Sequence, residues 1–82
     1  MTLQEIKDQF TEEEFTIAEG FDEAIIGVED SSMRIIYSIN AMLLILQNEG
    51  MDEEDALEHF YFNIGGAYIG EKTPIYCWTN PH

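Results

Sequence analysis

The sequence predicts a small α+β protein in which a three-stranded antiparallel sheet is covered by helices, in the order α-α-β-β-α-α-β. A chain of 82 residues has the length of one domain. Hydrophobic residues make up 45% of it, which is enough to form an apolar core. Strand-like runs also alternate with segments of helical periodicity. We therefore expect a single domain over residues 1–82, with a helical N-terminal segment (1–20) and a ββααβ core (21–82).

The N-terminal segment shows two helical patterns. Apolar residues from Leu3 to Phe10 are spaced so that they lie on one face of a helix. The stretch from Thr11 to Glu14 then has the form of a capping box, in which a threonine and a glutamate three residues later satisfy the free amides of a helix start. This pattern predicts a second short helix that ends at Gly20.

The strands are marked by β-type composition. Residues 24–28 and 33–37 are β-type runs on either side of a polar four-residue connection, an arrangement typical of an antiparallel hairpin. A third strand is expected over residues 73–78. Pro74 marks its start or an edge position, because proline cannot donate a hydrogen bond to a neighbouring strand.

The first core helix is marked by an uninterrupted apolar run from Ala41 to Leu46, with Ser38 or Asn40 as its N-cap and Gly50 as its C-terminal stop. A helix that is apolar on nearly all sides must be buried on nearly all sides. That is difficult in a chain this small. The run therefore raises an alternative, in which two copies form a homodimer through residues 41–46.

The second core helix has the clearest start signal, with Asp52 as N-cap and Asp55 at the third helical position. One buried face is expected to follow, formed by Leu57, Phe60, Tyr61, Ile64 and Tyr68. The aromatic residues of this half are denser than a core alone requires. Filling the core is the favoured interpretation, and an exposed binding surface is the alternative. The set comprises Phe60, Tyr61, Phe62, Tyr68, Tyr76 and Trp78.

The chain is strongly acidic. Seventeen Asp and Glu residues against three Lys and Arg residues give a formal net charge of -14. Ten acids lie between Glu5 and Asp30, and six lie between Glu49 and Glu58. Helix starts account for some of them, because negative charge is stabilised there. The excess predicts a surface that binds a basic partner, formed by Glu12, Glu13, Glu14, Glu19, Asp22, Glu23, Asp52, Glu53, Glu54, Asp55 and Glu58.

The same composition disfavours several functions. Nucleic acid and anionic lipid would repel this charge, so direct binding of DNA or RNA is not expected. The longest nearly apolar run falls well short of the ~20 residues that cross a bilayer, so we expect no membrane association. A lone cysteine and an N-terminus without a signal-peptide pattern indicate a cytoplasmic protein.

The sequence contains no complete motif for nucleotide binding or metal binding. Residues 65–73 partly match a phosphate-binding loop, yet Glu71 precedes Lys72, and Pro74 prevents the helix whose amides would hold phosphate. The adjacent acids at 52–55 lack the alternate spacing of a calcium loop, and the histidines and cysteine are too scattered for zinc. We expect no metal site, no cofactor and no enzymatic activity.

Several stretches also carry a resemblance. They are Ala-Ile-Ile-Gly-Val at 24–28, Arg-Ile-Ile-Tyr at 34–37, the helix that begins Gly-Met at 50–51, and the glycine-containing stretch from Asn63 to Ile75. Over residues 21–78 the chain resembles small acidic proteins encoded by tailed bacteriophages. The resemblance brings no activity and no catalytic residues. It implies a phage protein that acts in the cytoplasm of a bacterial host.

Three explanations of the acidity remain open. The leading one is a non-enzymatic inhibitor that mimics DNA and occupies a basic, nucleic-acid-binding surface of a host or phage protein, such as a nuclease, a defence complex or a polymerase. At one charge per ~1.7 Å, fourteen charges correspond to roughly 24 Å of duplex. The alternative is a homo-oligomeric structural or accessory subunit assembled through residues 41–46. The third is adaptation to a salty environment.

Overall fold

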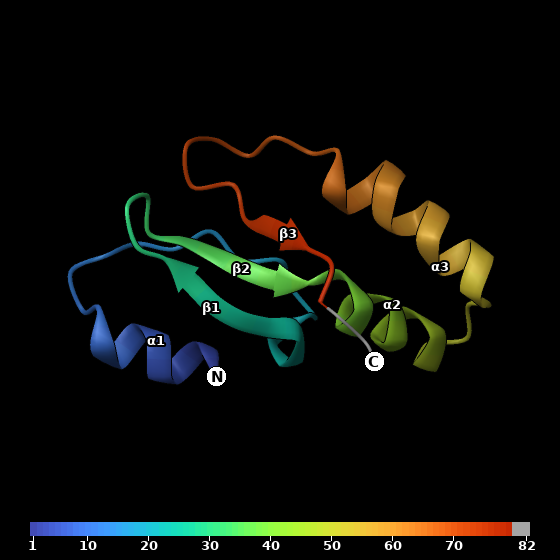
Figure 1. Ribbon diagram of the computed structural model, residues 1–82, viewed down its shortest axis with the longest axis horizontal. Helices are drawn as coiled ribbons and strands as arrows, with labels where there is room; N and C mark the ends of the chain where they lie inside the picture. Colours follow the sequence, from blue (N-terminus) through green and yellow to red (C-terminus); the bar gives the residue numbers. More distant parts are fainter. Residues whose placement is uncertain (80–82) are drawn as a thin grey trace.

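The computed structural model describes residues 1–79 and confirms the α+β class (Figure 1). A 3-10 helix, η1 (Asp22–Ala24), precedes the sheet, and a π-helical turn, η2 (Tyr61–Gly65), follows the last α-helix. No helix in this part of the chain is long and apolar enough to cross a membrane. The other elements are α1 (Leu3–Gln9), β1 (Ile25–Glu29), β2 (Arg34–Ser38), α2 (Ile39–Asn48), α3 (Glu53–Phe60) and β3 (Ile75–Cys77).

The sheet has the strand order β1-β2-β3 and is mixed. β1 and β2 form the expected antiparallel hairpin, with Val28 opposite Ile35. β3 pairs with β2 in parallel, with Ile75 opposite Ile36, so the expectation of a purely antiparallel sheet is wrong. The route of the chain explains the difference. α2 and α3 lie beyond the end of β2, and the following loop runs back past the sheet, so β3 enters from the end at which β2 begins (Figure 1).

The first N-terminal helix forms, with a capping box that the sequence prediction overlooked. The Thr2 hydroxyl accepts a hydrogen bond from the Glu5 amide at 3.1 Å, and the Glu5 carboxylate accepts one from the Thr2 amide at 2.8 Å. Two of the free amides at the start of α1 are thereby satisfied.

The second N-terminal helix is absent, so the expectation of a helical segment over residues 1–20 holds only for α1. Residues 13–18 have no regular secondary structure. Long-range contacts replace helical hydrogen bonds there. The Phe15 ring meets Phe10 edge to face at 6.4 Å, and the Ala18 amide donates to the Tyr37 hydroxyl at 2.8 Å. Tertiary packing thus overrides the local helix signal.

Both ends of α2 and the start of α3 are those that the sequence predicts. The Ser38 hydroxyl accepts the Ala41 amide at 3.1 Å at the start of α2. Gly50 follows the end of α2 with a φ of +110°, a conformation that glycine adopts without steric cost. At the start of α3, the Asp52 carboxylate accepts the Asp55 amide at 2.8 Å. Both helices are therefore defined by local side-chain signals.

α3 and η2 bury fewer apolar residues than expected. Phe60 is buried, but Leu57, Tyr61 and Tyr68 are exposed, so the predicted continuous face is wrong at these three positions. The α-helix changes to the π-helical turn after Phe60. A π-helical turn is wider than an α-helical one, so the later side chains leave the original face.

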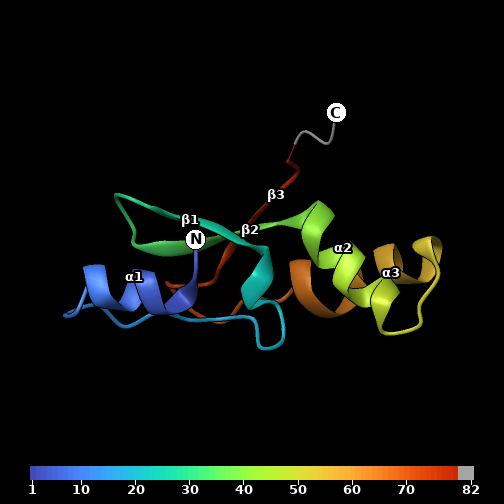
Figure 2. The ribbon, with the colours of Figure 1, turned by 90° about the horizontal axis from the view of Figure 1, so that it is seen from below.

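The two faces of the hairpin differ in how well they are covered. Figure 2 shows α1 and residues 10–21 on the same side of β1 and β2. Ile35 and Tyr37 are fully buried, and alternate residues of a strand share a face. Ile36, which lies between them, is only partly buried, and Ile26 is 47% exposed. α1 and the following residues 10–21 therefore cover one face of the hairpin, and the other face is more exposed.

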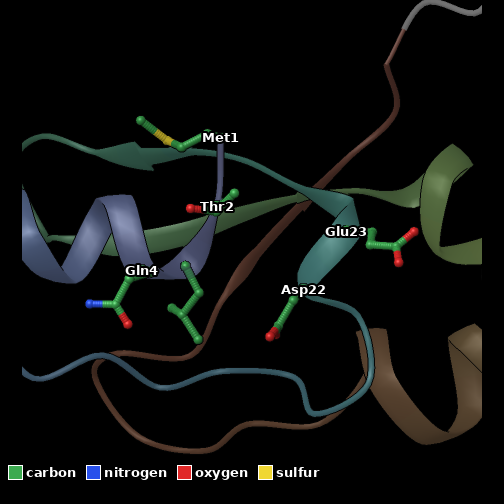
Figure 3. Close-up of a pocket in the computed structure, with 6 residues that line it drawn as sticks. Met1, Thr2, Gln4, Asp22 and Glu23 are labelled. Atoms are coloured by element: carbon green, nitrogen blue, oxygen red, sulfur yellow. The ribbon is translucent and has the colours of Figure 1, made fainter.

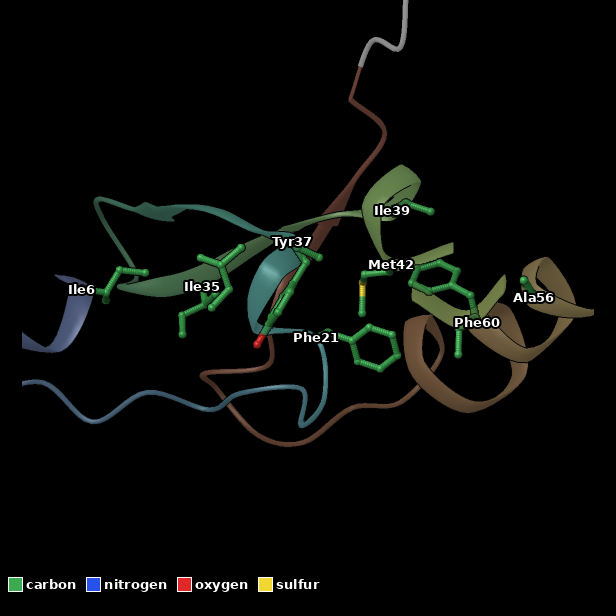
Figure 4. Packing of buried hydrophobic residues seen from close by; sticks show 11 residues of the cluster. Ile6, Phe21, Ile35, Tyr37, Ile39, Met42, Ala56 and Phe60 are labelled. Atoms are coloured by element: carbon green, nitrogen blue, oxygen red, sulfur yellow. The ribbon is translucent and has the colours of Figure 1, made fainter. Parts of the chain in front are cut away.

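One hydrophobic cluster connects the two ends of the molecule (Figure 4). Ile6 of α1 and Ile35 of β2 lie at one end, and Met42 of α2 and Phe60 of α3 lie at the other. Tyr37 lies between these two groups and is fully buried. Because the cluster is continuous, residues 1–79 share one core.

Candidate functional site

All eleven residues predicted to bind a basic partner are exposed. They belong to a wider pattern, because 16 of the 17 carboxylic acids are exposed and only Glu29 is partly buried. The acidic side chains of this protein therefore face solvent along the whole described chain.

The structure does not bring the two acidic blocks together. Residues 12–14 follow α1 at one end of the molecule, and residues 52–55 begin α3 at the other end of its 39 Å long dimension (Figure 1). η1 lies between these ends (Figure 2). We distinguish two surfaces accordingly. The N-terminal acidic segment comprises Glu12, Glu13, Glu14, Glu19, Asp22 and Glu23, and the α3 acidic cluster comprises Asp52, Glu53, Glu54, Asp55 and Glu58.

Two of the three basic side chains hold the loop before β3 in place. The Lys72 ammonium contacts the Glu13 carboxylate at 2.9 Å and lies 5.7 Å from the centre of the Phe15 ring. Arg34 donates a hydrogen bond to the Thr73 carbonyl. The contact between Lys72 and Glu13 is the one ion pair within residues 1–79. Most of the acidic charge is thus not paired within the fold.

Glu29 has a structural role that the sequence prediction did not assign. Its carboxylate accepts hydrogen bonds from the amides and hydroxyls of Ser31 and Ser32, at 2.6 to 3.0 Å. The Ser32 hydroxyl and the Ser31 amide contribute most, and together these bonds lower the pKa of Glu29 to about 2. This carboxylate stabilises the hairpin turn in its charged form.

A hollow of about 470 Å³ lies between the start of α1 and η1 (Figure 3). Asp22 and Glu23 project from η1, and Met1 and Leu3 supply apolar surface beside them. Thr2 and Gln4 complete the lining. The Asp22 and Glu23 side chains point in different directions, so each carboxylate is separately available to a cation such as a lysine or arginine side chain.

A second hollow, of about 460 Å³, lies between α2, α3 and the chain that follows β3. We call it the Trp78 groove, because Trp78 is the single tryptophan of the chain and is 55% exposed here. Leu43 and Leu57 provide further apolar surface. Glu53 and Glu54 of the α3 acidic cluster also line it, together with Asn40. This groove therefore repeats the combination of two adjacent carboxylates with apolar walls.

Hydrogen bonds to the start of α2 position the end of the Trp78 groove. The Thr79 amide donates to the Asn40 side-chain oxygen at 2.8 Å, and the Thr79 hydroxyl donates to the same oxygen at 3.1 Å. The Thr79 hydroxyl is also 2.9 Å from the Ser38 hydroxyl. These bonds tie the residue after Trp78 to α2. From the sequence, Asn40 has only a possible role as a helix cap. The spacing of residues along the chain does not reveal its long-range contact with Thr79.

The aromatic residues of the second half divide into a buried and an exposed group. The Phe60 ring is buried and meets the partly buried Tyr76 edge to face at 5.4 Å. Phe62 and Tyr68 are 83% and 79% exposed, so core filling does not explain them. Core filling therefore explains Phe60 and Tyr76, and for the exposed residues a binding surface stays a prediction. The exposed group is Tyr61, Phe62, Tyr68 and Trp78.

The apolar run of α2 is largely used within the fold. Met42 and Leu46 are buried in the core, and Ala41, Leu43 and Ile45 are partly buried against it. Leu44 is the exposed residue of this run, at 60%. Little apolar surface is left on the helix that suggested a homodimer.

The glycine-rich stretch at 65–73 is closed by its own threonine. The Thr73 hydroxyl accepts the Ile69 amide at 2.8 Å and donates to the Gly70 carbonyl at 2.6 Å. These groups are therefore occupied within the loop. Across residues 1–79, no three Asp, Glu, His or Cys side chains converge on a point where they could hold a metal ion.

Comparisons of the chain with protein-family models, with curated proteins and with solved structures found no match. The two acidic surfaces and the hollows beside them are the features of the molecule that indicate a function.

Proposed function

We propose that this protein is a non-enzymatic binding protein whose carboxylates occupy a basic surface of another protein. The observation that supports this is the exposure of 16 of 17 acids, with one ion pair within residues 1–79. Charge that is neither buried nor paired within the fold is available to a partner. The net charge of -14 also exceeds the magnitude of about 2 to 8 that keeps a small domain soluble.

The basic surface that we propose is one that ordinarily holds nucleic acid, in a nuclease, a defence complex or a polymerase. A duplex with one charge per ~1.7 Å carries about 23 charges over the long dimension of this protein. The number of carboxylates in this protein, 17, is similar to that number of phosphate charges. The protein would then act as an inhibitor that competes with DNA. The resemblance to phage proteins suggests the cytoplasm of an infected bacterium as the setting.

A homo-oligomer assembled through α2 receives less support from the structure. Interface cores are usually built from several apolar side chains, and the run of α2 exposes mainly Leu44. A second copy would also bring a second charge of -14 close to the first. We therefore favour a partner of opposite charge.

Affinity capture from bacterial lysate tests the proposal. The immobilised protein is expected to retain nucleic-acid-binding proteins at about 50 mM salt and to release most of them by about 200 mM, because the attraction is screened. Added duplex DNA should displace the same proteins. Retention that is unchanged over this salt range, or that duplex DNA does not reduce, would contradict the proposal.

A further inference from the structure

The Trp78 groove combines apolar surface with charge that the fold does not neutralise. Leu57 and Trp78 are 36% and 55% exposed and line the same hollow, so its walls present large apolar side chains to solvent. Glu53 and Glu54 are exposed on the same rim, and the one ion pair of residues 1–79 lies elsewhere. A partner that is complementary to this groove therefore needs both apolar side chains and a positive charge.

The apolar surface continues beyond this groove. Trp78 also lines an adjoining hollow of about 270 Å³, together with Tyr61 and Tyr76. Trp78 lines both hollows, so it connects the apolar surface at Leu57 with that at Tyr61. An occupant that covers the surface from Leu43 to Tyr61 must be longer than one side chain.

We propose that the Trp78 groove is the docking site for an amphipathic helix of the basic partner. Apolar side chains of that helix pack between Leu43 and Leu57, and an arginine or lysine lies against the Trp78 ring. Glu53 and Glu54, which both line the groove, accept hydrogen bonds from cationic side chains of that helix. Cation–π attraction is strongest at tryptophan, and charge-assisted hydrogen bonds are stronger than neutral ones. This inference rests on the proposed function and names the part of the acidic surface that contacts the partner.

Charge complementarity selects this occupant over two others. A nucleic acid would place phosphates beside Glu53 and Glu54, and a second copy of this chain offers Lys7 as the one exposed Lys or Arg side chain within residues 1–79. A basic amphipathic helix presents apolar and cationic side chains three or four residues apart, about 5 to 6 Å from one another. That spacing lets one face of the helix meet both the apolar wall and the carboxylates.

A synthetic peptide tests the inference. The probe is a helical peptide of about 18 residues, five turns long, built from arginine, leucine and alanine. Because Trp78 is the single tryptophan, its fluorescence reports on the groove directly. We expect a saturable shift of its emission to shorter wavelength at low salt, since the partner helix removes the ring from water.

Three variants locate the binding site. The double variant Glu53→Gln/Glu54→Gln is expected to weaken binding about tenfold, since both charged acceptors are lost. The matched control Asp30→Asn/Glu71→Gln removes the same two charges at exposed positions outside the groove, and it should change the affinity by less than about twofold. Trp78→Ala, measured by calorimetry, should also weaken binding about tenfold. Circular dichroism and thermal unfolding show that each variant is folded.

The outcomes separate this inference from the proposed function. Equal weakening by the two double variants would overturn the groove as the site, because binding would then follow total charge, and the proposed function would stand. An affinity unaffected by Trp78→Ala would overturn it in the same way. If the peptide does not bind at low salt, the inference fails, and the proposed function is decided by the competition with duplex DNA alone.

Discussion

The two acidic surfaces differ in how the fold holds them. The N-terminal acidic segment is irregular over residues 13–18 and is held by specific contacts, among them the hydrogen bond to Tyr37 and the ion pair of Glu13 with Lys72. The α3 acidic cluster stands on a regular helix that is anchored by the buried Phe60. Acidic side chains that are similarly exposed therefore have different roles at the two ends. In the N-terminal acidic segment Glu13 pairs with Lys72, whereas in the α3 acidic cluster Asp52 caps the helix and Glu53 and Glu54 border an apolar groove.

The largest expected effect tests the anchor of the α3 acidic cluster. Phe60→Ala should lower the free energy of unfolding by about 3 to 5 kcal/mol, because it removes a buried ring and leaves a cavity. Urea unfolding measures the change. Phe62→Ala is the matched control, since that ring is exposed, and it should change stability by less than about 0.5 kcal/mol. Similar costs for the two variants would show that α3 is not anchored by Phe60.

A smaller effect is expected at the anchor of the N-terminal acidic segment. Tyr37→Phe keeps the ring but leaves the Ala18 amide without its acceptor, which should cost about 1 to 3 kcal/mol. Hydrogen exchange of the Ala18 amide should also be faster in this variant. Tyr61→Phe, at an exposed tyrosine, controls for the loss of a hydroxyl. Unchanged exchange at Ala18 would mean that other contacts hold this segment.

Acid titration separates a carboxylate used by the fold from those available to a partner. The pKa of Glu29 in the folded protein is about 2, below its ordinary value of 4.5. Its stabilising contribution is therefore complete above about pH 4.5 and is lost as the pH falls towards 2. Urea unfolding across this range should show that Glu29→Gln removes this part of the pH dependence. Asp30→Asn serves as the neighbouring control, and the same loss in both variants would contradict the assignment to Glu29.

The smallest effect concerns the ion pair of the N-terminal acidic segment. Lys72 and Glu13 are both partly exposed, and exposed pairs contribute only about 0.2 to 1 kcal/mol. Glu13→Gln should lower stability by an amount in that range, and added salt should reduce the difference. Glu14→Gln removes an equal charge next to it, outside the ion pair. Thermal unfolding that ranks Glu14→Gln as the more destabilising variant would contradict a structural role for Glu13.

Elements with local signals could be predicted from the sequence. The hairpin, the Ser38 cap of α2 and the Asp52 cap of α3 each depend on residues that are close in the chain. The N-terminal segment shows the limit of such signals. Thr2 and Thr11 both begin a capping pattern, but only the one at Thr2 forms, because the residues after Thr11 make long-range contacts instead.

Features that depend on the path of the chain could not be predicted in this way. The parallel pairing of β3 follows from the loop that returns to the start of β2, and no local pattern encodes that route. The Trp78 groove likewise depends on the contact of Thr79 with Asn40, which are 39 positions apart. The exposure of the predicted acidic residues could be expected from residue type alone, because charged side chains are rarely buried without a partner.

β3 also has a consequence for the order of folding. It is a strand of three residues that pairs with a segment nearly forty positions earlier, so its loop closure is costly, and it is expected to dock late and to detach before the core unfolds. Trp78 follows β3 directly, so the groove exists only in molecules in which the strand has docked. A helix bound there would hold β3 in place. A transient loss of this one strand would release the helix and uncover the Tyr37 and Phe60 rings against which Tyr76 packs.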